Sequence, residues 1–489
     1  MLFNSISFVL FLPTVFFIHW LLVRQSQKSQ NIVLLLASYF FYGSWDWRFL
    51  GLIIFSSFVD FSIGKRIYQE QNQKKRKNWL LTSILTNLLL LVFFKYYNFF
   101  ADSFYELFQL FGITVSPFTL KILLPVGISF YTFQTMSYTI DIYRGKMKPT
   151  NSALAFFTFV GFFPQLVAGP IERAADLVPQ FLRKRAFSYK NGVSGVRLIL
   201  WGLFKKVAVA DTLALLVNYV YENPSSASSW QIVLALLFFS IQVYCDFSGY
   251  SDLAIGTAKL FNINLSTNFK TPFFSKSMKE FWGRWHITLS TWFRDYIYIP
   301  LGGNRSTEFK WHRNLFLVML ISGLWHGASW NFVIWGGLHG AFLVFENLIK
   351  PHVPKFLSTA NRKPWHGLWN LVSISYTFLA FTIALLLFRA KNLQDVSTLI
   401  EGIQLKSIIH ESFLVNLQAI YEEPIHMISL GISLVILGTV DYKIRNSSID
   451  YQLNKLPRLL NYVLYSLLII WLLFAGTFSQ PQEFVYFQF

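Results

Sequence analysis

Long apolar runs recur from one end of this sequence to the other, and they restrict the fold more than any other feature. A helix needs about 20 mostly apolar residues to cross the hydrocarbon core of a bilayer. The long runs occupy residues 5–23, 79–94, 153–167, 232–244, 315–338, 368–388, 425–440 and 459–475, and shorter ones occupy residues 32–42 and 50–63. They predict an all-α, polytopic integral membrane protein with about 10–12 transmembrane helices.

Charged residues are scarce along the chain, as expected for a protein that has lipid as part of its solvent. Only 13% of the 489 residues are charged, against about 25% in an ordinary soluble domain. The 54% hydrophobic content excludes a disordered chain. The single cysteine, Cys245, cannot form an internal disulfide or build a thiolate metal site alone.

Basic residues outnumber acidic ones by 42 to 24, a net charge of +18, and their placement predicts the orientation in the membrane. Residues 1–11 contain no Lys or Arg, whereas Arg24 and Lys28 follow the first apolar run. A cleaved signal peptide has the opposite bias, so we expect an uncleaved first helix with its N-terminus outside. Basic clusters expected on the cytoplasmic side lie at residues 65–66, 74–77, 183–185 and 443–458. The charge excess therefore indicates orientation rather than a nucleic-acid partner.

The chain is predicted to form one integral domain, residues 1–489, without a fixed repeat or a detachable soluble module. Residues 391–421 are more polar and are expected to lie on the surface as an amphipathic helix. No inverted halves with matching Gly- or Pro-broken helices are visible, which disfavours a secondary transporter.

Polar residues inside apolar stretches are costly, so they mark candidate functional positions. In residues 124–145, Pro125 and Gly127 predict an irregular entry into a helix. Four polar residues of this stretch are expected to face other helices: Ser129, Gln134, Ser137 and Tyr138. In residues 161–173 a Gly-Pro pair precedes Glu172, which predicts a solvated helix end or, alternatively, the wall of a vestibule.

Residues 244–254 contain two carboxylates, Asp246 and Asp252, that are too polar to face lipid. A pair of carboxylates can contribute to a site for a hard cation, but no further acidic cluster lies nearby. Helix capping, or pairing with Arg284 or Arg294, is the simpler interpretation.

His286 lies among three tryptophans in residues 281–296, where Glu280 and Arg284 have the i,i+4 spacing of an ion pair on a helix. This segment is too polar to span a bilayer and too aromatic for a free loop. It is predicted to form a helix seated at the membrane interface and packed against the bundle.

His326 lies between Gly323 and Gly327 inside an apolar run, and the glycines permit close approach of another chain or a ligand. A buried imidazole is readily kept neutral and able to accept a proton. His326 is therefore a candidate general base, with packing as the alternative, and His286 is a candidate second hydrogen-bonding group. Zinc is disfavoured, because neither an HExxH motif nor a third ligand is apparent. His339 would point about 220° away around an uninterrupted helix.

Several segments resemble the membrane-bound O-acyltransferase (MBOAT) family. The most specific are FWGRWHITLSTWFRDYIYIPLGGNR at residues 281–305 and RNLFLVMLISGLWHGASWNFVIWGGLHG at residues 313–340. The similarity extends to NIVLLLASYFFYGSWDWRFL, LPVGISFYTFQTMSYTIDIYRG, FPQLVAGPIER, DFSGYSDLAIG and the closing FVYFQF, so it covers nearly the whole chain. More narrowly, the chain resembles the bacterial branch of alginate and peptidoglycan O-acetyltransferases, and more distantly the D-alanyl transfer proteins.

The resemblance implies a fold and a site. The implied fold is a ring of transmembrane helices around a central tunnel, with the catalytic region at about residues 244–345. His326 would act as general base on a hydroxyl, and His286 would orient or polarise the acyl carbonyl. The resemblance places further residues along or beside the tunnel: Trp285, Trp325, Trp330, Asn331, Arg294, Asp295 and Ser290.

It also implies a reaction in a bacterial cell membrane. An acyl group, expected to be acetyl, would leave a cytoplasmic thioester, either acetyl-CoA or a carrier-protein thioester, with no bound cofactor or metal. The acceptor would be a cell-envelope or extracellular polysaccharide, reached directly or through a partner resembling SGNH-hydrolase acyltransferases. The alternatives are D-alanyl transfer to teichoic acid, a non-catalytic transporter or flippase, and a scaffold that docks an envelope enzyme.

Overall fold

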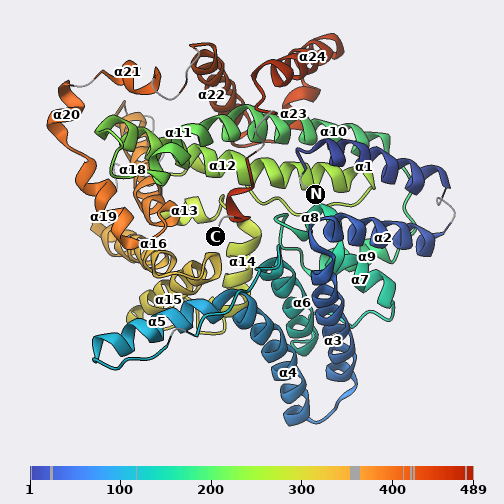
Figure 1. Ribbon diagram of the computed structural model, residues 1–489. Helices are drawn as coiled ribbons and strands as arrows, with labels where there is room; N and C mark the ends of the chain where they lie inside the picture. Colours follow the sequence, from blue (N-terminus) through green and yellow to red (C-terminus); the bar gives the residue numbers. More distant parts are fainter. Residues whose placement is uncertain are drawn as a thin grey trace. The chain divides into compact units, whose positions relative to one another are not determined.

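The computed structural model describes residues 1, 3–22, 26–116, 118–352, 364–410, 412–418, 421, 424–478 and 482–487, and no strand occurs among them. Arg24, used above for orientation, lies outside these residues. Figure 1 shows helices of very different length joined by connections that range from short turns to extended loops. The chain divides into two compact units, Met1–Ile199 with Leu253–Ser266, and Leu200–Asp252 with Thr267–Phe489. That the two units form one domain stays a prediction.

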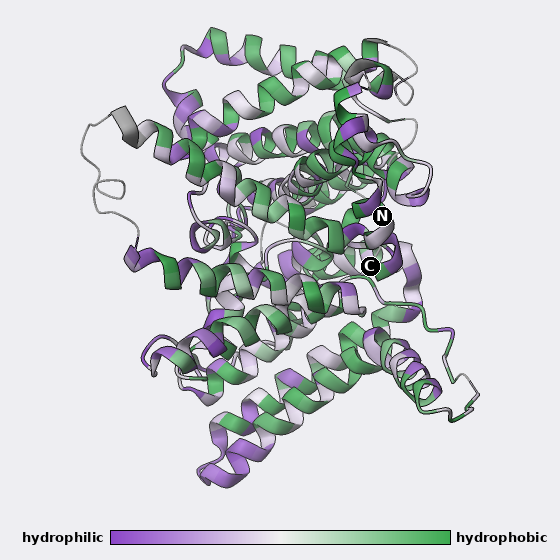
Figure 2. Ribbon diagram, turned by 90° about the vertical axis from the view of Figure 1, so that its left-hand side faces the viewer, coloured by the Kyte–Doolittle hydropathy of each residue, from purple (hydrophilic) through white to green (hydrophobic). Residues whose placement is uncertain are grey.

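Within the described residues, helical stretches long and apolar enough to cross a membrane are Gln27–Gln69, Gln73–Leu110, Ser229–Leu260, Trp330–His352, Gly367–Arg389, Ile425–Ile444 and Arg458–Ala475. These 7 stretches confirm an all-α, multi-pass membrane protein. The first two contain 43 and 38 residues, about twice the length of one crossing, so the number of crossings stays a prediction. Figure 2 shows hydrophobic residues along the helices and hydrophilic residues at several helix ends.

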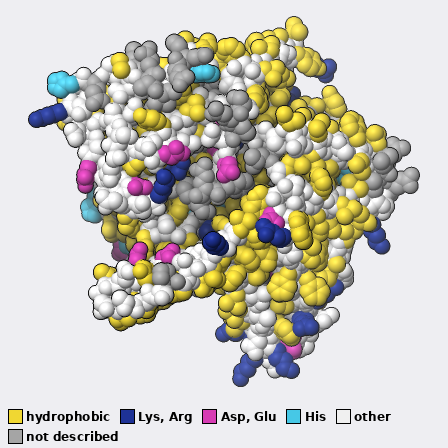
Figure 3. Space-filling model, in the orientation of Figure 1, with side chains coloured by type: hydrophobic (Ala, Val, Ile, Leu, Met, Phe, Trp, Pro, Cys, Tyr) yellow, Lys and Arg dark blue, Asp and Glu magenta, His cyan; other side chains and the backbone are white. Residues whose placement is uncertain are grey.

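The first unit contains α1 (Ile6–Phe17), α2 (Gln27–Asp46), α3 (Leu50–Gln69), α4 (Gln73–Leu91), α5 (Tyr97–Leu110), α6 (Ile128–Tyr143), α7 (Ala153–Gly161), α8 (Phe163–Leu166), α9 (Ala174–Phe181) and most of α10 (Tyr189–Leu203). Lys and Arg side chains gather around the turn between α3 and α4 (Figure 3). They belong to two of the predicted basic clusters, residues 65–66 and 74–77.

Helix α6 is enclosed on all sides, since every residue from Ile128 to Ile142 is buried. Gly127 precedes it with a φ of 76°, and a side chain at this position would collide with the Leu166 carbonyl. The predicted irregular entry is thereby confirmed, because only glycine adopts such a conformation freely. The four polar residues expected to face other helices, Ser129, Gln134, Ser137 and Tyr138, are all buried.

Two predictions about the first unit are wrong. The apolar run at residues 153–167 is not one helix, because it breaks at Phe162 into α7 and the four-residue α8. Glu172 is not a solvated helix end, since it is only 2% exposed. Its carboxylate accepts hydrogen bonds from the backbone N–H and the hydroxyl of Ser266.

The second unit contains the π-helical turn η4 (Phe204–Ala210), α11 (Asp211–Glu222), most of α12 (Ser229–Leu260), α13 (Met278–Trp282), α14 (Ile287–Phe293), η6 (Arg294–Tyr298), α15 (Glu308–His326), α16 (Trp330–Ile349), α18 (Pro364–Arg389), α19 (Leu393–Gly402), α20 (Leu405–His410), α21 (Phe413–Gln418), α22 (Pro424–Ile444), α23 (Ile449–Asn454), α24 (Arg458–Ala475) and η8 (Val485–Phe487). The polar stretch at residues 391–421 forms three short helices, α19 to α21, rather than one amphipathic helix.

The run at residues 315–338 is likewise not a single span. It ends as α15 at His326, continues in extended conformation at Gly327, and starts again as α16 at Trp330. The two helices pack closely, because a side chain at Gly323 would collide with the Phe332 carbonyl and meet Gly336 at 3.0 Å. The close approach predicted for Gly323 is therefore made by a neighbouring helix.

Candidate active site

His326 is the last residue of α15, and the break at Gly327 places its ring at the end of a helix inside the second unit. Its side chain is buried, with 4% exposed. The Nδ1 atom lies 3.1 Å from the hydroxyl of Tyr486. Rings of Trp335 and Phe388 pack edge-on against it, with centroids 4.9 and 5.5 Å away. These aromatic rings shield the His326 imidazole from water, while its Nδ1 atom contacts a hydroxyl.

His286 occupies the residue before α14 in a left-handed conformation, with a φ of 42°. The predicted interface helix is thus two short helices, α13 and α14, with the histidine at their junction. Glu280 and Arg284 form the expected i,i+4 ion pair, at 2.7 Å. Trp285 and Trp292, from the same stretch, are buried. The segment therefore packs against the rest of the second unit through its tryptophans, and its place at the membrane interface stays a prediction.

Hydrogen bonds around Asn268 fix the tautomer of His286. Asn268 Oδ1 accepts from the backbone N–H and the hydroxyl of Thr288, at 3.2 and 2.9 Å. His286 Nδ1 lies 3.2 Å from the same oxygen, so Nδ1 must carry the proton. Burial lowers the pKa of His286 to about 3, which keeps the ring neutral at pH 7. Its Nε2 is then a hydrogen-bond acceptor, which cannot polarise a carbonyl as a donor would.

Aromatic rings connect the two histidines. The ring of Trp325 lies 6.0 Å from that of His286 and 5.0 Å from that of His326. On another side, Phe247 contacts both His286 and Tyr486, with centroids 4.7 Å away in each case. The two predicted histidines therefore border one aromatic cluster that includes Trp325 and Phe247, and their catalytic roles stay a prediction.

The remaining predicted tunnel residues lie in varied surroundings. Trp285 is buried and stacks on Phe281, with centroids 5.5 Å apart. Asn331 is buried and donates to the Ala390 carbonyl at 2.9 Å. Trp330 is 53% exposed. Arg294 forms an ion pair with the adjacent Asp295 at 2.8 Å. The Ser290 hydroxyl lies 3.4 Å from the Trp285 carbonyl. A role for any of them along a tunnel stays a prediction.

The partners predicted for the two aspartates are wrong. Asp246 pairs with Lys206 at 2.8 Å, and Asp252 pairs with Lys205 at 2.6 Å. Both lysines come from η4, which packs beside α12, whereas Arg284 and Arg294 pair with carboxylates close in sequence. Among the residues that the structure describes, no group of three His, Cys, Asp or Glu side chains could hold a metal ion.

Sequence reasoning missed Tyr486 and Asn268 as members of the site. The closing motif FVYFQF was noted for its resemblance alone, and nothing in it indicates that its tyrosine contacts a histidine 160 residues earlier. Asn268 lies in the irregular connection between α12 and α13, where no periodic pattern marks a functional residue. Figure 1 shows the end of the chain, in red, beside α12.

The fold and the site together define a class: a multi-pass membrane protein with two buried histidines, one of them in contact with a hydroxyl. The family model of the membrane-bound O-acyltransferases matches residues 34–389, and the chain belongs to this family. The predicted family and the O-acyltransferase activity are thereby confirmed. His286 and His326 lie inside the matched residues, and Tyr486 lies beyond them.

Curated relatives support the same assignment. A protein of Pseudomonas aeruginosa named probable alginate O-acetylase AlgI is 41% identical over 400 residues, covering 81% of this chain and 73% of its own. The peptidoglycan O-acetyltransferase of Helicobacter pylori is 35% identical, covering 100% and 98%. The teichoic acid D-alanyltransferase of Bacillus subtilis is 27% identical and covers only 52% of this chain and 67% of its own.

Proposed function

We propose that this protein transfers an acetyl group from a cytoplasmic thioester to a hydroxyl of a cell-envelope or extracellular polysaccharide. The relatives named for alginate and peptidoglycan acetylation support the acetyl group and the glycan acceptor. The donor is acetyl-CoA or a carrier-protein thioester. The protein lies in the bacterial inner membrane with its N-terminus outside, and an SGNH-hydrolase-like partner completes transfer to the glycan.

The contact between His326 and Tyr486 carries the chemical part of this proposal. A hydroxyl within hydrogen-bond reach of a buried base is the usual arrangement of an activated nucleophile. Burial raises the pKa of the Tyr486 hydroxyl well above its usual range, so free phenolate is scarce. The proton must therefore leave for His326 as the oxygen attacks, which is the role of a general base.

Two balanced steps follow. The Tyr486 oxygen attacks the thioester carbonyl, its proton passes to His326, and the C–S bond breaks as the C–O bond forms. The imidazolium then protonates the departing thiolate, which leaves an acetyl ester on Tyr486. In the second step a hydroxyl of the acceptor attacks this ester, gives its proton to His326, and the proton returns to the tyrosine oxygen.

His286 has a different part in this scheme. With the proton on Nδ1, its Nε2 accepts a hydrogen bond and can hold the incoming hydroxyl of the acceptor in place. Asn268 acts as a positioning residue, because it fixes the tautomer and orientation of the ring. This proposal replaces the expectation that His286 polarises the acyl carbonyl.

The decisive experiment incubates membranes that contain the protein with radiolabelled acetyl-CoA and follows label on the protein and on the glycan. His326→Ala is expected to abolish both signals while the protein still accumulates in the membrane. His286→Ala should slow transfer strongly with little change in the donor concentration that gives half-maximal rate. Wild-type transfer by His326→Ala would refute the catalytic assignment and favour a transporter or scaffold.

D-alanyl transfer is the alternative within the same chemistry, supported by the more distant teichoic acid relatives. It requires a D-alanyl thioester on a carrier protein. Supplying the membranes with labelled acetyl-CoA in one reaction and D-alanyl carrier protein in another separates the two donors directly.

A further inference from the structure

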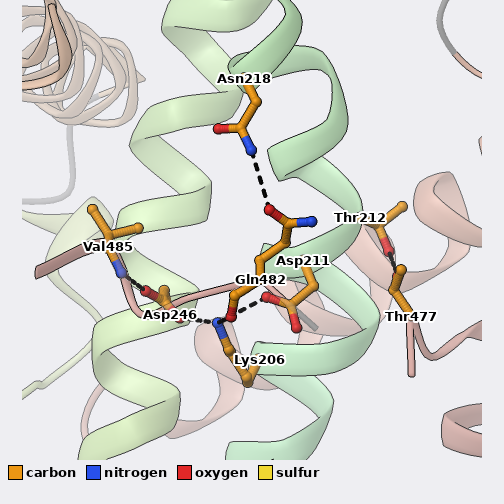
Figure 4. Close-up of polar contacts among 8 residues, drawn as sticks. All are labelled: Lys206, Asp211, Thr212, Asn218, Asp246, Thr477, Gln482 and Val485. Atoms are coloured by element: carbon orange, nitrogen blue, oxygen red, sulfur yellow. Dashed lines mark hydrogen bonds and ion pairs between the residues drawn. The ribbon is translucent and has the colours of Figure 1, made fainter. Parts of the chain in front are cut away.

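A buried cluster of charges lies in the second unit, formed by Lys206 of η4, Asp211 at the start of α11 and Asp246 of α12. Lys206 Nζ lies 2.8 Å from Asp211 Oδ1 and 2.8 Å from Asp246 Oδ1. The three side chains are between 1% and 9% exposed. We call these residues the anchoring network (Figure 4). They have no place in the acyl-transfer steps above.

The backbone of residues 482–486, here called the C-terminal segment, contacts every member of the anchoring network. Lys206 Nζ donates to the Gln482 carbonyl at 3.0 Å, and the Gln482 backbone N–H donates to Asp211. The Val485 N–H donates to Asp246 Oδ2 at 2.7 Å. Asn218 adds a side-chain contact to Gln482 at 3.1 Å, as Figure 4 shows.

The charges explain why the network and the segment depend on each other. Two carboxylates and one ammonium leave a formal excess of one negative charge when all three are ionised. Burying an unbalanced carboxylate is costly unless its oxygens accept strong hydrogen bonds. The segment supplies such donors through the N–H groups of Gln482 and Val485. Withdrawal of the segment would therefore leave buried charges unsatisfied, which opposes its release.

The anchored segment leads directly into the active site. Tyr486 follows Val485 in sequence, and its ring packs against Phe247, the residue that follows Asp246. Phe484 stacks on Tyr486 with centroids 5.6 Å apart and also contacts Phe247 at 5.6 Å. Fixing the Val485 N–H on Asp246 therefore restricts where the Tyr486 hydroxyl can lie.

We propose that Lys206, Asp211 and Asp246 are positioning residues that anchor the C-terminal segment and so hold the Tyr486 hydroxyl on His326. The catalytic consequence rests on the proposed function, whereas the anchoring itself is testable without any activity. A neighbouring ion pair gives a matched control: Lys205 and Asp252 lie on the same two helical elements, at 2.6 Å, and Lys205 donates to Ser248 rather than to the segment.

The test uses the single cysteine of the chain. In a Cys245→Ala background, Val485→Cys places a thiol on the segment at a position that is 2% exposed, and its backbone N–H is retained. Membranes are treated with N-ethylmaleimide, and the rate of labelling reports how often the segment leaves its site. Acyl transfer is measured in parallel with an unmodified Val485.

Asp246→Ala and Lys206→Met are expected to raise the labelling rate at least about tenfold, the effect of losing one charge-assisted hydrogen bond, and to lower acyl transfer by a similar factor. Lys205→Met should leave labelling at the starting rate. Asp246→Asn, which keeps the shape of the side chain and removes its charge, should raise labelling by a smaller factor and provides the test if Asp246→Ala fails to accumulate.

Unchanged labelling in Asp246→Ala, Asp246→Asn and Lys206→Met would overturn the proposal, and so would equal acceleration by Lys205→Met. His326→Ala separates the two hypotheses, because it should abolish transfer while the thiol stays protected. If wild-type membranes transfer no acyl group but the labelling pattern holds, the proposed function fails and the anchoring stands.

Discussion

Replacing Tyr486 by phenylalanine removes a hydroxyl that lies 3.1 Å from His326 Nδ1 and keeps the aromatic ring. The ring contacts with Phe247 and Phe484 do not involve the hydroxyl, so the segment should stay in place. The lost hydrogen bond, 3.1 Å long, contributes about 0.5–1.5 kcal/mol to stability. The protein should therefore still fold and accumulate in the membrane.

The effect on activity depends on what the hydroxyl does. If Tyr486 accepts the acyl group, its loss removes the first step, and transfer should fall by more than about 10³-fold, as expected when a nucleophile is removed. If it only orients His326, about 1 kcal/mol of lost interaction would reduce transfer about fivefold. The two expectations differ enough for a simple membrane assay to separate them.

The assay measures label from radioactive acetyl-CoA on the glycan and on the protein, before and after hydroxylamine, which cleaves esters. Tyr421→Phe is a matched control, because it removes another buried tyrosine hydroxyl, one that donates to the Thr212 carbonyl at 3.2 Å. This control should keep nearly full transfer. Residual transfer by Tyr486→Phe above about one tenth of wild type would refute the acyl-tyrosine step.

Two further predictions concern the fold. Gly323→Ala should sharply reduce the yield of monodisperse protein in size-exclusion chromatography, because the added methyl group collides with the Phe332 carbonyl. The control Gly337→Ala should be tolerated, because its methyl group meets neighbouring side chains at 3.4 Å or more. Equal yields of the two variants would contradict the packing argument. Burial raises the pKa of Glu172 from 4.5 to about 7, so the folded protein holds this proton more tightly than the unfolded chain. The contribution of the protonated carboxyl to the free energy of unfolding is therefore complete below pH 4.5 and is lost as the pH rises through about 7. In thermal unfolding experiments in detergent, the wild-type protein should lose up to roughly 3 kcal/mol of unfolding free energy relative to Glu172→Gln between pH 5 and 8. Parallel dependence of the two proteins' stability on pH would contradict this expectation.

The sequence predicted the all-α membrane class because apolar runs of crossing length are a local signal. It also predicted both histidines, since polar groups stand out against an apolar background. The helix break at Gly327 and the left-handed backbone at His286 could not be predicted in this way. Both depend on what packs around the chain, so the single span expected at residues 315–338 and the single helix expected at residues 281–296 were wrong. The expected seat of the latter segment at the membrane interface stays a prediction.

The partner of Asp246 was likewise beyond what the sequence pattern can predict. Arg284 and Lys206 lie about equally far from Asp246 in the sequence, 38 and 40 residues away, and Arg284 pairs instead with Glu280, four residues before it. Lys206 is buried in a π-helical stretch that lies beside α12. No sequence pattern distinguishes a lysine placed for this purpose from one that contributes to the cytoplasmic charge excess.

The site is assembled from three pieces of chain that are held in place by independent interactions. The end of α15 places His326, Asn268 fixes His286, and the anchoring network fixes the segment with Tyr486. Because these supports share no hydrogen bond among those described, their losses should differ in kind: Asn268 variants should disturb His286 without freeing the segment, and network variants should free the segment without changing the tautomer of His286. Two aromatic rings connect these supports: Phe247 contacts both His286 and Tyr486, and Trp325 contacts both His286 and His326. Coupling among the three pieces of chain should therefore depend on Phe247 and Trp325.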